Sequence, residues 1–330
     1  MGVYDKYTFP LEALMKIVIT DADTVTGGDI SFDRFDRFGE VVIHGLTASD
    51  EVADRIADAD IALCNKTPMT ADNMKNAKNL KYIGLFATGF NNIDLDYTST
   101  HGITVCNVPS YSTEAVAQQT FALLLEIVNR THDYNDLVMK GDWIKSRTFS
   151  FFPLPMLELS GKTIGLVGYG SIGKRVADIA KAIGMKVLVY KRRAENDPTV
   201  EFVTLNELLR RSDVVSLHCP LNRDSENMMT AERFAQMKQG AVFINTARGG
   251  LVDELALKDA LLSGRLLGAG LDVLRQEPMS ADCPLLGVKN CIITPHIAWA
   301  GLETRIRLMG VVESNIADFL SGSPKNTVNP

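Results

Sequence analysis

Three polar side chains that could form an acid–base site each stand shortly after an apolar run of the sequence. They are Arg248, Glu277 and His296. We predict that these runs are parallel β-strands, whose carboxyl ends meet at the edge of the sheet where ligands bind. A guanidinium there can bind a carboxylate, an imidazole can transfer a proton, and a carboxylate can orient the imidazole. Together the three groups suit the reduction of a 2-oxo acid.

The segment GYGSIG carries a glycine pattern between a predicted strand at 163–168 and a predicted helix at 171–183. In a dinucleotide-binding turn the first glycine permits the tight turn, the second admits a pyrophosphate, and the third lets the helix pack on the strand. The helix N-terminus then supplies N–H groups to the phosphates. The alternative is an ordinary turn between a strand and a helix. The residues that we expect to contact the cofactor here are Gly168, Tyr169, Gly170, Ser171, Ile172 and Gly173.

A cluster of cations, Lys191, Arg192 and Arg193, follows the next predicted strand, at 186–190. Dinucleotide-binding domains specific for NAD carry an acidic residue here for the adenosine ribose. Lys191 and Arg192 would instead bind a 2′-phosphate, which favours NADP without excluding NAD. The alternative is a solvated basic loop whose acidic partner comes from elsewhere in the chain.

Short β-branched runs alternate with helical patterns along the chain, which predicts the α/β class with parallel sheets. We expect strands at 16–20, 41–45, 61–65, 81–86, 103–107, 163–168, 186–190, 201–203, 213–218, 241–246, 269–273 and 291–294. Shorter helices are expected near 49–59, 70–77, 94–101, 171–183, 205–211, 230–238, 254–263 and 302–320. One long helix should cover 112–134 with Ser112 as its cap, followed by an aromatic and Pro-rich stretch at 141–156. Residues 1–14 would be an extension or a leader.

The composition restricts the class of protein. The chain has 330 residues, of which 46% are apolar and 22% charged, and a formal net charge of −6. These fractions are typical of globular proteins and predict about two domains. The acidic balance argues against a nucleic-acid partner, and no run of about 18 apolar residues predicts a membrane span. No spacing of His, Cys or acidic residues predicts a metal site. Scattered cysteines and the lack of a signal-peptide pattern predict a cytoplasmic protein.

Several segments are similar to motifs of the D-isomer-specific 2-hydroxyacid dehydrogenases. They are GLVGYGSIGKRVA, SLHCPLNRDSENMM, FINTARGGLVDELAL, GAGLDV with the following EP, and ITPHIAWA. Weaker similarity extends over 16–325. The segments NKTPMT, YIGLFATGFNNID and PHIAWA resemble the glycerate dehydrogenase, or hydroxypyruvate reductase, branch. The resemblance implies an oxidoreductase that uses NAD(P)H to reduce hydroxypyruvate or glyoxylate to D-glycerate or glycolate.

The resemblance implies a role for each residue of the acid–base site. Arg248 would bind the carboxylate and carbonyl oxygen of the substrate, and His296 would protonate that oxygen as hydride arrives. Glu277 would hydrogen-bond the imidazole of His296 and orient it. Arg248 and His296 would also border the cofactor. Thr88 and Gly89 in the first domain would hold the substrate carboxylate.

Further cofactor contacts are implied at other strand ends. Asp272 would bind the nicotinamide carboxamide, Cys219 and Pro220 would line the adenosine side, and Thr246 and Ala247 would line the nicotinamide ribose. The remaining histidines are expected to be structural or surface residues: His44, His101, His132 and His218.

The domain organisation implied by the resemblance is discontinuous. Residues 1–112 and 299–330 would form the substrate domain, and 113–298 an inserted NAD(P)-binding Rossmann domain. Both would be Rossmann-like or flavodoxin-like doubly wound domains. A homodimer would form through the cofactor domain, with 141–156 either as a dimer contact or as a self-packed loop.

Two other functions are open. A 3-phosphoglycerate dehydrogenase-like enzyme would need a basic pocket for the substrate phosphate. A dinucleotide-sensing protein like the C-terminal-binding corepressors would keep Arg248, Glu277 and His296 without depending on turnover. Formate dehydrogenase is disfavoured because Glu277, and not a glutamine, would be the partner of His296.

Overall fold

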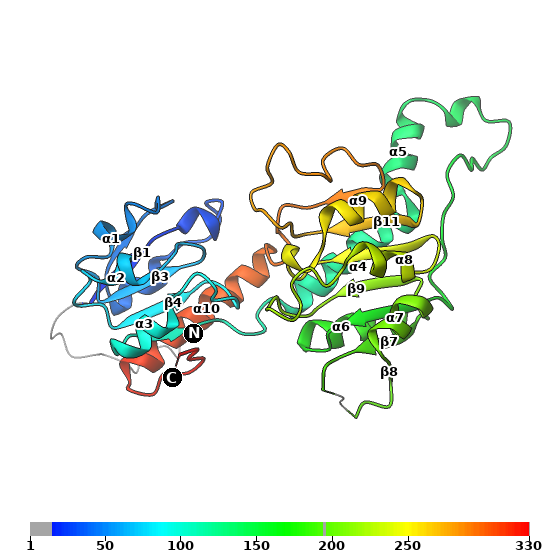
Figure 1. The fold of residues 1–330 in the computed structure, drawn as a ribbon. Helices are drawn as coiled ribbons and strands as arrows, with labels where there is room; N and C mark the ends of the chain where they lie inside the picture. The colour runs from blue at the N-terminus through cyan, green and yellow to red at the C-terminus, as the bar shows by residue number, and fades with distance from the viewer. Residues whose placement is uncertain (1–14, 194–195, 330) are drawn as a thin grey trace, which may run out of the picture. The chain divides into compact units, whose positions relative to one another are not determined.

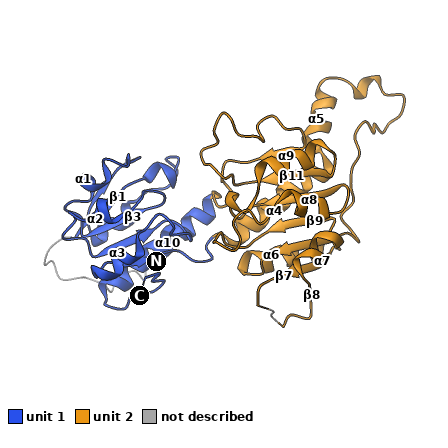
Figure 2. Ribbon diagram, in the orientation of Figure 1, with its two compact units in different colours: residues 1–111, 302–330 blue, residues 112–301 orange. Residues whose placement is uncertain are grey.

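The computed structural model describes residues 15–193 and 196–329, which form two compact units (Figures 1 and 2). Unit 1 contains the chain up to Tyr111 and again from Leu302, and unit 2 contains Ser112–Gly301. We expected the domains to divide after 112 and 298, and the compact units divide after 111 and 301. Unit 2 therefore interrupts unit 1 in the sequence. The expectation for residues 1–14 lies outside the described part of the chain.

Unit 1 is built on a parallel sheet with the strand order β2-β1-β3-β4-β5, the order of flavodoxin-like folds. The strands are Met15–Ile19 (β1), Gly39–Ile43 (β2), Ile61–Cys64 (β3), Tyr82–Leu85 (β4) and Thr104–Cys106 (β5). Its α-helices are Val52–Arg55 (α1), Ala71–Met74 (α2), Leu95–Thr100 (α3) and Leu302–Leu320 (α10). Every residue of β3 and β4 is buried, as expected for parallel strands covered on both faces.

Unit 2 has a parallel sheet in the order β12-β11-β10-β9-β6-β7-β8. Counted from β6, this is the classical Rossmann order, in which ligands bind at the carboxyl ends of the strands. The strands are Thr163–Val167 (β6), Lys186–Tyr190 (β7), Glu201–Phe202 (β8), Val214–Leu217 (β9), Ala241–Asn245 (β10), Leu266–Leu271 (β11) and Cys291–Ile293 (β12). The α-helices are Thr113–Asn129 (α4), Thr131–Met139 (α5), Ser171–Ala182 (α6), Leu205–Arg211 (α7), Ala231–Gln236 (α8) and Glu254–Leu262 (α9).

Strand β11 differs from its prediction, because it spans Leu266–Leu271 instead of 269–273. Gly268 and Gly270 weaken the strand pattern in the sequence, but packing requires them. A Cβ atom at Gly268 would lie 2.7 Å from a side-chain atom of α4, and one at Gly270 would lie 2.8 Å from another. Helix α4 therefore packs directly on the backbone of the strand that leads to Asp272.

The long helix predicted over 112–134 is divided into α4 and α5. Arg130 lies between them in the left-handed conformation, with φ of 55°. The carboxylate of Glu126 accepts hydrogen bonds from the Thr131 hydroxyl and from the N–H of His132 (3.1 Å), and so satisfies donors at the start of α5. Ser112 lies at the N-cap of α4, but its side chain makes no capping hydrogen bond. Within residues 15–193 and 196–329, no helix combines the length and apolarity that crossing a membrane requires.

Candidate active site

The glycine turn between β6 and α6 has the geometry of a phosphate cradle. Gly168 has φ of +106°, and a Cβ atom there would lie 2.5 Å from the carbonyl oxygen of His218. A Cβ atom at Gly173 would lie 2.5 Å from the carbonyl oxygen of Gly168, so the helix begins close against the strand. Gly170 is different, because its Cβ position has no protein atom within 4 Å. The turn therefore leaves open space at the position where a pyrophosphate would approach the backbone.

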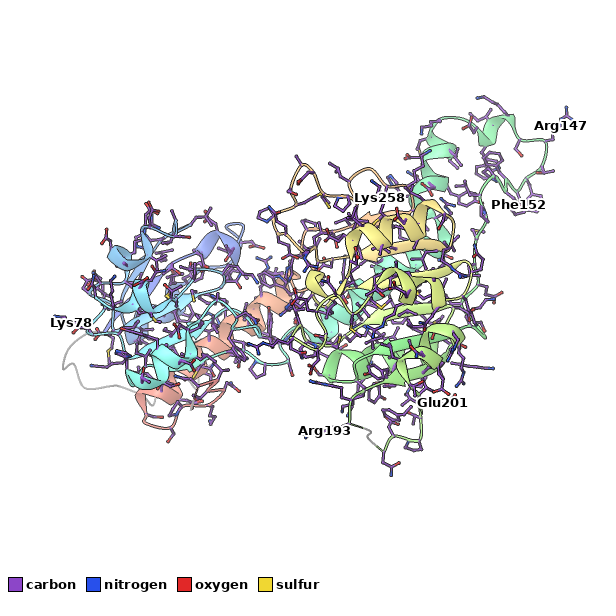
Figure 3. All side chains as sticks on the ribbon, viewed as in Figure 1. Lys78, Arg147, Phe152, Arg193, Glu201 and Lys258 are labelled. Atoms are coloured by element: carbon purple, nitrogen blue, oxygen red, sulfur yellow. The ribbon has the colours of Figure 1, made fainter. Side chains whose placement is uncertain are left out.

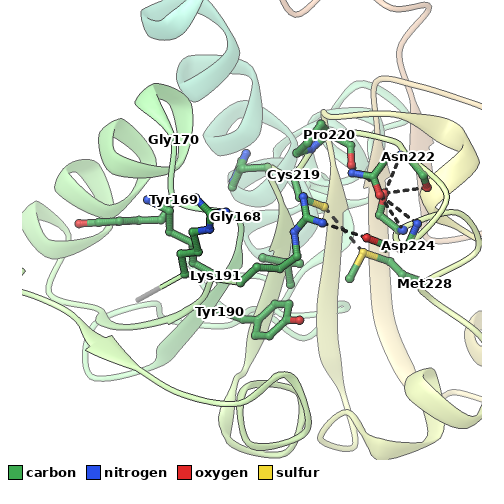
Figure 4. A pocket seen from close by; sticks show the side chains of 15 residues that line it. Gly168, Tyr169, Gly170, Tyr190, Lys191, Cys219, Pro220, Asn222, Asp224 and Met228 are labelled. Carbon is green, nitrogen blue, oxygen red and sulfur yellow. Dashed lines mark hydrogen bonds and ion pairs between the residues drawn. The ribbon is translucent and has the colours of Figure 1, made fainter. Parts of the chain in front are cut away.

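A pocket of about 680 Å³ lies beside this turn, at the carboxyl ends of β6, β7 and β9 (Figure 4). The predicted cofactor residues in its lining are Gly168, Tyr169, Gly170, Lys191, Arg192, Cys219 and Pro220. Arg193, the third residue of the predicted cationic cluster, also lines the pocket. The sequence prediction missed other lining residues: Val167, Tyr190, His218, Asn222, Asp224, Ser225 and Met228. Their one signal in the sequence is that most of them follow a strand end. The pocket and the glycine turn fit a dinucleotide.

The cationic cluster borders this pocket, and the structure shows its acidic neighbour. Nη1 of Arg192 lies 2.9 Å from Oδ2 of Asp224, which stands on the loop after β9. Tyr169 packs in the core of unit 2, and its hydroxyl donates to Oδ2 of Asp197 at 2.7 Å. Hydrogen bonds from Thr199 and from this Tyr169 hydroxyl hold the pKa of Asp197 down to about 2. An acidic partner from another loop, the alternative left open by the sequence, is therefore present for Arg192.

His218 lines the pocket, so its expected role as a purely structural or surface residue is incomplete. Its Nε2 lies 2.9 Å from the hydroxyl of Ser216, which belongs to strand β9. Burial lowers the pKa of His218 to about 4, and the ring is therefore neutral at physiological pH. Cys219 follows it, and burial raises the pKa of that thiol to about 11. The pocket wall here is uncharged.

His218 should make the stability of unit 2 depend on pH. The pKa of its imidazole is about 4 in the folded chain and about 6.5 in an unfolded one. Between these values only the unfolded chain binds the proton, so the free energy of unfolding falls as the pH drops from 6.5 towards 4, by at most about 3 kcal/mol. Urea unfolding at pH 7.5 and 4.5 measures this loss. The variant His218→Asn should lose less over the same interval, and an equal loss would contradict the assignment.

His296 and Glu277 form a hydrogen-bonded pair. Nδ1 of His296 lies 2.7 Å from Oε2 of Glu277, and Oε1 of the same carboxylate accepts the N–H of Leu274 at 2.9 Å. A carboxylate only accepts hydrogen bonds, so Nδ1 carries the proton and Nε2 is left to exchange a proton with a ligand. The side chains are 28% and 36% exposed, which leaves the imidazole accessible.

Asp272 holds the loop that carries His296. We expected its side chain at the nicotinamide, but the residue is 1% exposed. Its Oδ1 accepts the Thr294 hydroxyl at 2.6 Å and the Ile297 N–H at 2.9 Å, and its Oδ2 accepts the Ala298 N–H at 2.8 Å. Burial raises the pKa of Asp272, although these hydrogen bonds oppose the shift. The carbonyl oxygen of Asp272 also accepts the N–H of His296, whose φ is +56°.

The loop that carries Arg248 lies against the loop that carries Glu277. A Cβ atom at Gly249 would lie 1.9 Å from the backbone carbonyl carbon of Leu274, so only glycine permits this approach. Asn245 fixes the turn, because its Nδ2 donates to the carbonyl oxygen of Arg248 at 2.9 Å. The structure thus brings the segments of Arg248, Glu277 and His296 to the ends of β10, β11 and β12.

Other predicted site residues lie outside the lining of the pocket. Thr246 is 7% exposed and its hydroxyl is 3.0 Å from that of Thr120 on α4; Ala247 follows it in the same turn. In unit 1, the Thr88 hydroxyl donates to the carbonyl oxygen of Val108 at 2.7 Å, just before Gly89 and after β4. Among the described residues, no group of three or more His, Cys, Asp or Glu side chains is placed to hold a metal ion.

A Rossmann-type unit with a glycine phosphate turn and an accessible His–Glu pair beyond its strands defines a dinucleotide-dependent oxidoreductase. A family model described as "D-isomer specific 2-hydroxyacid dehydrogenase, NAD binding domain" matches residues 121–298. The chain belongs to this family. It is an NAD(P)H-dependent enzyme acting on small 2-oxo acids, and the predictions of family, fold class and enzyme class are confirmed.

Three relatives illustrate this similarity. Hydroxypyruvate reductase of Blautia hydrogenotrophica is 44% identical and covers 96% of this chain and 100% of its own. Glycerate dehydrogenase of Methylorubrum extorquens is 40% identical over 84% of this chain and 88% of its own. The structure of an NADPH-dependent glyoxylate/hydroxypyruvate reductase from Sinorhizobium meliloti, in complex with NADP and malonate, has a TM-score of 0.84 and 26% identity, and covers 96% of this chain and 97% of its own.

Proposed function

We propose that this enzyme reduces hydroxypyruvate and glyoxylate to D-glycerate and glycolate. The observation that carries the proposal is the His296–Glu277 pair, 2.7 Å apart, beside the loop of Arg248. Relatives at 40–44% identity over most of the chain are named for these reactions. The pair supplies the proton that carbonyl reduction needs, and Arg248 supplies a cation for the carboxylate of a 2-oxo acid.

The residues would divide the reaction as follows. The reduced nicotinamide, when bound, supplies a hydride for the carbonyl carbon. His296 donates the proton on Nε2 to the carbonyl oxygen, and Glu277 stabilises and orients the imidazole through Nδ1. Arg248 binds the carboxylate and polarises the carbonyl.

Cofactor binding would use the pocket and the turns next to it. The N-terminus of α6, at Ser171, Ile172 and Gly173, would hold the pyrophosphate, with Cys219 and Pro220 beside the adenosine. Thr246 and Ala247 would border the nicotinamide ribose. Lys191 and Arg192 would bind a 2′-phosphate, so we propose a preference for NADPH over NADH.

The variant Lys191→Asp tests this preference. An aspartate accepts hydrogen bonds from a ribose 2′-hydroxyl and repels a 2′-phosphate, so the ratio of kcat/KM for NADPH to kcat/KM for NADH should fall by at least about tenfold. Steady-state kinetics with both cofactors and one 2-oxo acid measures the ratio. An unchanged ratio would show that Lys191 does not read the 2′-position.

The substrate proposal is tested by a kinetic panel on the purified chain. Hydroxypyruvate, glyoxylate, pyruvate and phosphohydroxypyruvate are each combined with NADPH and NADH. Hydroxypyruvate or glyoxylate should give the highest kcat/KM. Preference for the phosphorylated acid would favour a 3-phosphoglycerate dehydrogenase-like enzyme. Cofactor binding without turnover of any acid would favour a corepressor-like sensor.

We also propose a cytoplasmic homodimer formed through unit 2. Residues 141–156 expose Trp143 (50%), Ile144 (88%), Phe149 (90%) and Phe152 (79%), and Figure 3 shows Phe152 and Arg147 on this projecting segment. So much exposed aromatic surface on one segment is typical of a protein contact. Five free thiols favour a reducing compartment. Sedimentation velocity of the full chain measures the oligomeric state.

A further inference from the structure

Two loops place opposite charges at the mouth of the pocket in unit 2. Arg192 follows β7 and Asp224 follows β9, and both residues line the pocket. Their side chains form an ion pair, with Nη1 and Oδ2 2.9 Å apart. Figure 4 shows Tyr190 and Lys191 on one side of the pocket and Asn222 and Asp224 on the other. The arginine expected to read a 2′-phosphate is therefore bound to a carboxylate.

The turn that carries Asp224 is fixed by its own hydrogen bonds. Oδ1 of Asn222 accepts the N–H of Asp224 at 3.0 Å and the N–H of Ser225 at 3.2 Å. The Ser225 hydroxyl donates to the carbonyl oxygen of Pro220 at 2.8 Å. This local network orients the backbone at Asp224 without help from a ligand. The backbone that carries Asp224 is thus held at the edge of the pocket, and a phosphate that binds Arg192 must break the ion pair with Asp224.

We propose that Asp224 reduces the selectivity for 2′-phosphorylated cofactor by competing with the 2′-phosphate for Arg192. The inference rests on the proposed binding of NADP(H) in this pocket. A 2′-phosphate must displace Asp224 from the guanidinium and is repelled by the same carboxylate, whereas a 2′-hydroxyl does neither. Asp224 therefore weakens the binding of the 2′-phosphorylated cofactor. It reduces the preference for NADPH over NADH that Lys191 and Arg192 create.

The size of the effect follows from the exposure of the pair. The side chains of Arg192 and Asp224 are 64% and 76% exposed, so solvent screens their attraction. Replacing Asp224 with asparagine should tighten the binding of a 2′-phosphorylated adenosine by roughly two- to fivefold, the range typical of exposed ion pairs. Binding of adenosine without that phosphate should not change.

Isothermal titration of the full chain with 2′,5′-ADP and with 5′-AMP tests the proposal. Asp224→Asn should lower the Kd for 2′,5′-ADP and leave the Kd for 5′-AMP unchanged. Arg192→Gln should raise the Kd for 2′,5′-ADP. When Arg192→Gln is already present, adding Asp224→Asn should change that Kd much less than it does in the wild-type chain. Glu201→Gln is the control, because it breaks a solvent-exposed ion pair with Arg211 that does not line the pocket, and neither Kd should change.

The possible failures are distinguishable. If the wild-type chain binds 2′,5′-ADP no more tightly than 5′-AMP and Arg192→Gln has no effect, the proposed NADP(H) preference fails and the selectivity role of Asp224 fails with it. If Arg192→Gln weakens 2′,5′-ADP but Asp224→Asn does not tighten it, only the role of Asp224 is overturned. An equal change for both nucleotides on Asp224→Asn also overturns that role, because Asp224 would then contact the shared adenosine.

Discussion

Replacement of His296 with asparagine is expected to lower kcat by at least about a hundredfold, the usual contribution of a general acid. Asparagine tolerates the left-handed backbone that His296 adopts, with φ of +56°, so the loop should keep its conformation. The variant retains hydrogen-bonding groups but cannot give up a proton at neutral pH. The consumption of NADPH with hydroxypyruvate measures kcat, and fluorescence titration measures the Kd for NADPH, which should change little.

The variant Glu277→Gln tests the role of the carboxylate that is hydrogen-bonded to His296. Glutamine keeps a hydrogen-bonding group near Nδ1 but removes the charge that stabilises the imidazolium, so kcat should fall less than in His296→Asn. If His296→Asn retains kcat within about tenfold of wild type, His296 is not the proton donor.

Replacement of Asp272 with asparagine is expected to reduce both activity and stability. The carboxylate of Asp272 accepts hydrogen bonds from Thr294, Ile297 and Ala298, and the residue is only 1% exposed to solvent. An amide nitrogen in place of one carboxylate oxygen would face a donor, so a buried polar group loses its partner. This costs about 2 kcal/mol of the free energy of unfolding. Because the same bonds hold the loop of His296, kcat should fall by at least about tenfold while the KM for NADPH changes little.

Thr294→Val separates the two roles of this network. It removes one of the hydrogen bonds to Asp272 and keeps the volume and the two backbone bonds, so its effects on kcat and on urea unfolding should both be smaller than those of Asp272→Asn. If Asp272→Asn lowers stability but leaves kcat unchanged, the carboxylate supports the fold without positioning His296.

The sequence predicted the elements whose pattern is local. The strand and turn at 163–173 were predicted correctly, because a β-branched run before spaced glycines has few other conformations. Predictions were wrong where distant contacts decide. The strand predicted at 269–273 spans Leu266–Leu271, because the packing of α4 on Gly268 and Gly270 explains glycines that weaken the strand pattern in the sequence. The division of the predicted helix 112–134 depends instead on local contacts that periodicity does not encode, because Arg130 adopts a left-handed conformation and Glu126 satisfies donors at the start of α5.

The active site, too, has parts that a local sequence pattern predicts and parts that depend on contacts between distant residues. Arg248, Glu277 and His296 could be placed at strand ends because the rule for parallel sheets applies to every such strand. Asp224 could not be found beside Arg192, because the two residues stand on loops after different strands and meet only in the folded unit. The burial of Asp272 was also beyond reach, since its partners lie more than twenty residues further along the chain.

The close approach of Gly249 to the backbone of Leu274 has a consequence for the redesign of this enzyme. The segment of Arg248 and the segment of Glu277 share one surface with no room for a side chain between them. A chimaera that takes only one of these two segments from a homologue would combine backbones from two different proteins at a contact that leaves no room for adjustment. Chimaeras that aim at a new acid should therefore transplant residues 245–250 and 272–278 as one unit.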